Sequence, residues 1–137
     1  LYKVELLHRT GRRVRPTEIG ERVLNLSRQI FGLEADAVQL LREAIPDPRF
    51  HIHKPEGALF LWLWFEGLPI HCQALYERLK AKNLLIVPGH YFFPGIDDPE
   101  WRHSQECIRL NYSQSEELVR RGIAILADEI NAIYRGS

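Results

Sequence analysis

The chain has few cysteines, no net charge and no long apolar run, and each absence excludes a class of protein. Cys72 and Cys107 are the two cysteines among 137 residues and form no CxxC pair, so we expect reduced thiols in a cytoplasmic protein. With 18 basic and 18 acidic residues, the chain is not expected to coat nucleic acid or an anionic membrane. The apolar run at residues 57–65 is about half the length of a bilayer span.

The first 16 residues, LYKVELLHRTGRRVRP, are basic and predict a β-hairpin. Gly11 can adopt the positive φ that a tight turn requires. Pro16 ends the second strand because it has no amide hydrogen to donate. Thr17 is then a natural N-cap for a following helix. The basic residues of this segment are Lys3, Arg9, Arg12, Arg13 and Arg15.

A long helix is predicted over residues 17–45, where Pro46 and Pro48 stop it. Its apolar residues recur at alternating steps of four and three, the heptad spacing of a coiled coil. A second apolar stripe lies beside the first, so we expect one stripe to pack on the chain's own domain and the other to form a homodimer seam. The alternative is that both stripes serve one core. The predicted seam residues are Ile19, Val23, Leu26, Ile30 and Leu33.

Residues 46–137 predict a small domain of strands and helices. Strands are expected at about 50–53, 58–65, 84–87 and 107–111, and helices at 70–82 and from Ser115 onward. The predicted fold class is α+β: a small mixed β-sheet covered by two helices, preceded by the hairpin (1–16) and the long heptad helix (17–45). The predicted core consists of the final helix and of apolar residues in the strands. These strand residues are Leu59, Leu61, Leu63, Leu85, Val87, Ile108 and Leu110.

Arg109 is the clearest candidate binding residue. In ECIRLNY it alternates with Ile108 and Leu110, so its side chain should lie on the opposite face of a strand. A guanidinium is costly to place in a sheet unless it is paired, and its planar fork matches a carboxylate. From the spacing alone, an internal salt bridge to an acidic residue is equally consistent.

Several histidines and cysteines are residue types that bind metals. His51-x-His53 would place two imidazoles on one strand face. No second pair at ligand spacing supports it, so we predict no metal site, with a structural metal as the alternative. The residues considered are His51, His53, His90, His103, Cys72 and Cys107.

Three motifs, HKPEGALFLWLWF, LYERLKAKNLLIVPGHYFFPG and CIRLNY, together resemble the C-terminal small domain of class I, fold-type I aminotransferases, which use pyridoxal phosphate. The resemblance covers about residues 36–134. It implies transamination of an amino acid such as valine with pyruvate, with Arg109 holding the substrate α-carboxylate and residues 88–95 near the active site.

The same resemblance places the Schiff-base lysine in a large domain that precedes this segment. Lys54, Lys80 and Lys82 do not fall at its position. We therefore expect an incomplete aminotransferase small domain that binds no cofactor, binds an amino or keto acid weakly if at all, and has no turnover alone. The alternative is a component of a working aminotransferase whose large domain comes from elsewhere.

Residues 1–37, which include VELLHRTGRRVRPTEIGERVLNLSRQIFGLEADA, resemble the wing and linker helix of LysR-type transcriptional regulators. The resemblance implies DNA-backbone contacts by Arg9, Arg12, Arg13 and Arg15 and a dimeric linker helix. The family's recognition helix is not in this sequence, so we do not expect nucleic-acid binding. A DNA-associated regulator fragment is the alternative, and the whole chain reads as a fragment or a chimera of two families.

The predicted seam can be tested with Ile30→Asp. A charge in the middle of an apolar seam is costly to bury, so we expect this variant to be monomeric while the unchanged chain is a dimer. The measurement is molar mass by light scattering. An unchanged mass would place the seam within a single chain's core.

Overall fold

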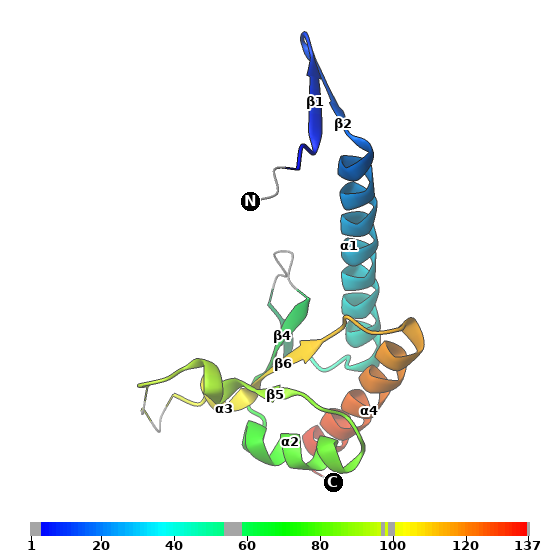
Figure 1. Cartoon of the computed structure of the whole chain (residues 1–137). Coiled ribbons are helices and arrows are strands. Elements are labelled where there is room, and N and C mark those ends of the chain that lie inside the picture. Colours follow the sequence, from blue (N-terminus) through cyan, green and yellow to red (C-terminus); the bar gives the residue numbers. More distant parts are fainter. Residues whose placement is uncertain (1–3, 54–58, 97, 99–100, 137) are drawn as a thin grey trace. The chain divides into compact units, whose positions relative to one another are not determined.

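The computed structural model describes residues 4–53, 59–96, 98 and 101–136 (Figure 1). It divides into two compact units, Leu1–Gly32 and Leu33–Ser137, with the boundary inside the long helix. Within the described ranges, none of the helices combines the length and the apolar character that a membrane crossing needs.

The first unit holds the predicted hairpin and the start of the predicted helix. Strands β1 (Leu7–Thr10) and β2 (Arg13–Pro16) pair antiparallel, and Gly11 in the turn has φ +63°. Helix α1 (Glu18–Ala44) follows at once. The Thr17 hydroxyl accepts a hydrogen bond from the Gly20 amide at 3.0 Å and donates to the Glu5 carbonyl at 2.8 Å. The predicted N-cap therefore also joins the helix to the chain before the hairpin.

The second unit is built on a four-stranded sheet in the order β3-β4-β6-β5. Its strands are β3 (Phe50–Ile52), β4 (Phe60–Phe65), β5 (Val87–Pro88) and β6 (Cys107–Asn111). All three pairings are antiparallel, so the predicted mixed sheet is wrong in this respect. The reason is topological: β4 and β5 run the same way on either side of a helix, but β6 inserts between them.

One face of the sheet carries the hydrophobic core. Leu61, Leu63 and Phe65 alternate along β4 and are fully buried, and Ile108 and Leu110 join them from β6. Helices α2 (Cys72–Ala81) and α4 (Glu116–Tyr134) contribute to the same core, as does the C-terminal part of α1. The predicted α+β class is confirmed, with the end of α1 as a third covering helix.

Two predicted core residues are in fact exposed. Leu59 precedes β4 and is 44% exposed, and Leu85 is 69% exposed whereas its neighbour Ile86 is 6% exposed. The predicted strand over 84–87 shrinks to Val87–Pro88, because Asn83 takes a left-handed conformation (φ 61°) after α2 and the Leu84 amide still donates to the Leu79 carbonyl. The turn sets which of the following residues points inward.

The opposite face of the sheet is covered by rings. Trp62 lies 5.2 Å from Phe92 and 5.8 Å from Phe93, measured between ring centroids, and Trp64 lies 4.8 Å from His103. These partners come from the 3₁₀ helix η1 (Gly89–Phe92) with the residue after it, and from the short helix α3 (His103–Glu106). The apolar run of β4 is thus covered on both faces, by helices on one side and by this aromatic face on the other.

Gly89 is where η1 approaches the sheet most closely, which makes it a test of this packing. A Cβ there would lie 2.6 Å from the Cys107 carbonyl oxygen, so we expect Gly89→Ala to lower the free energy of unfolding by about 1–3 kcal/mol. Gly32→Ala is the matched control, because nothing lies near its Cβ in α1 and it should gain about 0.5–1 kcal/mol. Urea denaturation measures both, and equal effects would contradict the close approach.

Candidate functional site

Arg109 lies in the middle of β6, on the aromatic face. Its strand neighbours are Trp62 of β4 on one side and Val87 of β5 on the other. Ile108 and Leu110 point into the core, so the alternation in the sequence predicts the side of the sheet correctly. The fold therefore places Arg109 on a surface formed mostly by aromatic rings.

The guanidinium of Arg109 is held by rings. Its central carbon lies 4.2 Å from the centroid of Phe60 and 4.8 Å from that of Phe92, distances at which a cation is attracted to an aromatic face. These contacts orient the planar group. A ring face accepts no conventional hydrogen bond, so they do not satisfy the N–H donors of the guanidinium.

Arg109 has an unused buried donor. Its Nε is buried and has no hydrogen-bond partner, and none of the ion pairs among the described residues includes it. The internal salt bridge that the spacing left open is thus not found in the part of the chain that the structure describes. A buried unpaired donor costs about 1–3 kcal/mol, and a carboxylate would supply the acceptor that it lacks.

The acidic residue on the neighbouring helix α3 is already engaged. Glu106 is buried, accepts a hydrogen bond from Trp64 Nε1 at 3.0 Å and pairs with Arg102 at 3.5 Å. Arg102 also donates to the Leu68 carbonyl at 2.8 Å. These bonds fix α3 against β4 and engage the Glu106 carboxylate, which forms no recorded pair with Arg109.

The described lysines do not fit the role of a Schiff-base lysine. Lys82 donates to the buried Glu129 at 2.6 Å, and Arg78 pairs with the same carboxylate at 3.1 Å. The hydrogen bond from Lys82 is the main reason that the pKa of Glu129 is lowered. Lys80 lies over the Tyr76 ring on the same helix. Lys3 and Lys54 lie outside the described residues. The two lysines that the structure describes are engaged within the fold and do not fit the lysine that pyridoxal phosphate needs.

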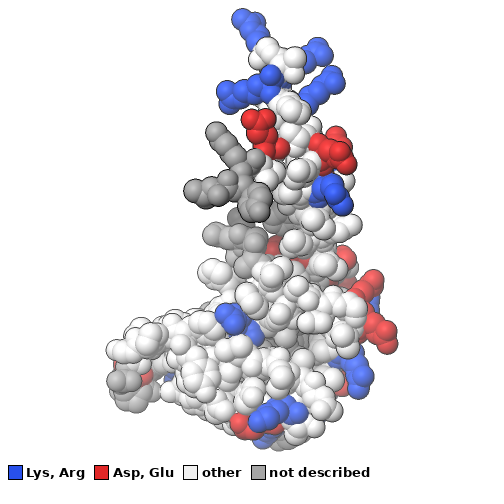
Figure 2. Space-filling view, in the orientation of Figure 1, with Lys and Arg blue, Asp and Glu red and all other residues white. Residues whose placement is uncertain are grey.

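The predicted hairpin arginines and seam residues lie in exposed positions. Lys and Arg side chains gather over the hairpin of the first unit (Figure 2). The seam residues Ile19, Val23, Leu26, Ile30 and Leu33 are 37–59% exposed. Their roles as DNA contacts and as a dimer seam stay predictions.

The histidines and cysteines considered as metal ligands lie in different surroundings. His51 contacts Glu66 at 2.9 Å. His71 and Cys72 at the start of α2 meet His90 of η1. Sequence reasoning considered Cys72 and His90 but missed His71, whose adjacency to Cys72 was the available signal.

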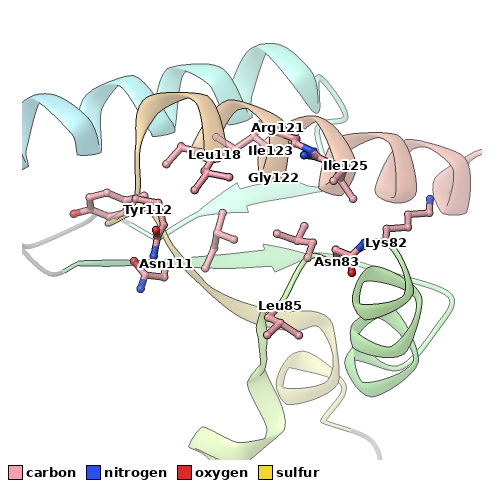
Figure 3. A pocket seen from close by; sticks show the side chains of 14 residues that line it. Lys82, Asn83, Leu85, Asn111, Tyr112, Leu118, Arg121, Gly122, Ile123 and Ile125 are labelled. Carbon is pink, nitrogen blue, oxygen red and sulfur yellow. The ribbon is translucent and has the colours of Figure 1, made fainter.

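An apolar recess of about 450 Å³ lies at the other end of the sheet. Figure 3 shows Leu118 and Ile125 of α4 across from Leu85 and Asn111. Its lining is largely aliphatic, and the charged residues at its rim, Lys82 and Arg121, do not converge on a point. This recess offers a packing surface and no arrangement for chemistry.

The fold of the second unit matches that of an aminotransferase small domain. No family model matches the chain. The chain is 49% identical to valine–pyruvate aminotransferase of Escherichia coli strain K12 over 102 residues. The aligned region covers 74% of this chain and 24% of that protein. The predicted aminotransferase resemblance is therefore confirmed: the chain is closely homologous to the C-terminal region of valine–pyruvate aminotransferase. The resemblance of residues 1–37 to LysR-type regulators stays a prediction.

Solved structures agree. The crystal structure of valine–pyruvate aminotransferase from Salmonella typhimurium LT2 matches with a TM-score of 0.76 and 44% identity, over 82% of this chain and 29% of that one. A putative amino-acid aminotransferase from Psychrobacter arcticum 273-4 matches with a TM-score of 0.73 and 44% identity, over 82% and 25%. The chain thus spans about a quarter of the length of the relatives it matches.

A binding arginine and a structural arginine respond differently to substitution by methionine. Arg109→Met keeps the bulk between Phe60 and Phe92 and removes the unpaired donor, so we expect its free energy of unfolding to change by no more than about 1 kcal/mol. Arg102→Met, which strips Glu106 of its ion pair, should cost about 1–3 kcal/mol. Thermal and urea unfolding measure both. A loss of about 3–5 kcal/mol in Arg109→Met would reveal a buried ion pair instead.

Proposed function

We propose that this chain supplies the small domain of a pyridoxal-phosphate-dependent aminotransferase and that Arg109 binds the substrate α-carboxylate. The observation that carries the proposal is the buried, unpartnered Nε of Arg109, held between two rings in a domain homologous to that of an aminotransferase. An arginine with a purely structural role would donate its buried N–H groups to acceptors within the fold. Arg109 instead keeps its Nε donor available for a ligand.

The chemistry of the site favours a small carboxylic acid. A guanidinium can donate two parallel hydrogen bonds to one carboxylate, which fixes the orientation of the acid as well as its position. The rings of Phe60 and Phe92 lower the local dielectric, which strengthens the pairing. Because the relatives are named for valine and pyruvate, we propose an amino acid and a 2-keto acid of that kind as substrates.

Turnover requires residues beyond the described ones. Pyridoxal phosphate, when bound, supplies the electron sink for moving the amino group, and it needs a lysine. Lys82 is committed to Glu129 and Lys80 lies over Tyr76, so we infer that the lysine and the phosphate site belong to a large domain of the same protein or of another chain. The small domain's part is to hold the acid.

We also propose that the exposed stripe of α1 pairs with a second copy of the chain. In support, Ile19, Val23 and Leu26 are each at least 44% exposed while they keep heptad spacing. An apolar stripe of this length on a single helix is seldom left in water. DNA-backbone contact by the hairpin arginines is a separate candidate, favoured by their clustering in Figure 2.

A graft tests the aminotransferase proposal. Residues 33–137, a compact unit, would replace the matched region of the E. coli enzyme. We expect the graft to bind pyridoxal phosphate and to transaminate valine with pyruvate. Arg109→Ala within the graft should lower kcat/KM for valine by about 30-fold or more, because removing a bidentate partner of a bound carboxylate costs at least about 2 kcal/mol.

Arg120→Ala is the matched control for this graft. Arg120 is exposed on α4 and pairs only with Glu116 among the described residues, so its loss should leave kcat/KM unchanged. Far-UV circular dichroism and the cofactor absorbance confirm folding of each variant. A folded graft that binds the cofactor and whose activity is indifferent to Arg109→Ala would overturn the assigned role.

A further inference from the structure

Three side chains with metal-binding atoms converge where α2 begins and η1 passes it. Cys72 Sγ lies 3.3 Å from His90 Nδ1 and 3.8 Å from His71 Nδ1. Each residue offers one ligand atom, and these three atoms lie within 4.8 Å of one another. Cys72 is fully buried, His90 is half-buried and His71 is exposed, so the sulfur lies at the inner end of the cluster.

The two sulfur–nitrogen distances are close to those of a tetrahedral metal centre. Zinc bonds to sulfur at about 2.3 Å and to imidazole nitrogen at about 2.0–2.1 Å, which puts the two ligand atoms about 3.5 Å apart at a tetrahedral angle. The observed sulfur–nitrogen distances lie on either side of that value. The three ligand atoms lie within 4.8 Å of one another, whereas two imidazole nitrogens on a tetrahedral zinc lie about 3.3 Å apart. Rotation of the exposed His71 side chain is therefore needed to bring both imidazoles to bonding distance.

We propose that His71, Cys72 and His90 bind a divalent transition metal of the zinc class. One thiolate and two imidazoles form a ligand set that suits zinc, and the thiol would release its proton as the metal binds. A cavity of about 470 Å³ is lined by both histidines, so water or another small donor can reach the fourth position. The site needs no part of the aminotransferase proposal.

Metal binding would replace a hydrogen bond that the chain already makes. His71 is the N-cap of α2, and its Nδ1 accepts from the Gln73 amide at 3.1 Å. A neutral imidazole has one nitrogen lone pair, so this ring cannot both accept that bond and bind a metal. Serine is a good N-cap without an imidazole, and it separates the two roles of position 71.

The metal would also connect α2 to the segment that covers Arg109. His90 and Phe92 belong to the same short 3₁₀ helix, and the Phe92 ring lies over the Arg109 guanidinium. Fixing His90 to Cys72 would hold η1 at the start of α2. The inferred site is thus placed to stabilise one wall of the candidate carboxylate site.

A second cysteine–histidine contact in the same chain is a control for the proposed metal site. Cys107 Sγ lies 3.5 Å from His103 Nε2, a second thiol–imidazole contact of similar length and burial. Among the described residues it has no third ligand, because the one cluster of three that could hold an ion is His71, Cys72 and His90. A metal that binds any cysteine–histidine pair would use both places, whereas the proposed site needs only the first.

Cobalt titration of the reduced, metal-free chain tests the proposal. We expect one equivalent of Co²⁺ to produce thiolate charge-transfer absorbance and the visible bands of a tetrahedral ion, and Zn²⁺ to displace it. Cys72→Ser should abolish the charge-transfer band and Cys107→Ser should leave it unchanged. His71→Ser should weaken zinc affinity by more than about tenfold while the Tm of the metal-free chain stays the same.

Each other outcome counts against the site. No saturable cobalt spectrum from the folded chain would overturn it, as would equal loss of the band in Cys72→Ser and Cys107→Ser. A His71→Ser variant that keeps full zinc affinity would remove His71 from the ligand set and leave too few ligands. Far-UV circular dichroism of every metal-free variant shows that the comparison is made between folded chains.

Discussion

The insertion of β6 between β4 and β5 is the constraint on which the second unit depends. Because successive residues of a strand face opposite sides, one five-residue segment supplies both the core and the candidate site. Ile108 and Leu110 pack under the helices, and Arg109 between them is presented to the aromatic face. A shift of one residue in its register would bury the guanidinium in the core and expose both aliphatic side chains.

Arg109 illustrates how a fold can keep a charged side chain whose buried donor is unpaired, at some cost to stability. The rings of Phe60 and Phe92 hold the charged group in place without satisfying its donors. The neighbouring carboxylate of Glu106 is occupied by Trp64 and Arg102, so no acceptor within the described fold competes for the site. One unsatisfied buried donor costs about 1–3 kcal/mol, which the burial of the large hydrophobic core can offset.

The short segment that begins at Gly89 connects several features of this face. Gly89 lies against the Cys107 backbone, His90 contacts the Cys72 sulfur, and Phe92 covers Arg109. A 3₁₀ helix has three residues per turn, so neighbouring residues project in different directions from one compact turn. The position of the carboxylate site and that of the cysteine–histidine cluster are therefore both set by where this turn rests on β6.

Local signals in the sequence were enough for the hairpin at Gly11, the N-cap at Thr17, the start of the last helix near Ser115 and the strand at 107–111. Each of these depends on the conformational preferences of adjacent residues. The side on which Arg109 lies also followed from alternation, and its proposed role from family resemblance. Tertiary structure alone decided the antiparallel order of the sheet, the burial of Ile86 in place of Leu85, and the meeting of His71 with His90. These depend on how segments far apart in the chain pack together, and the spacing of residue types along a strand or helix does not record that packing.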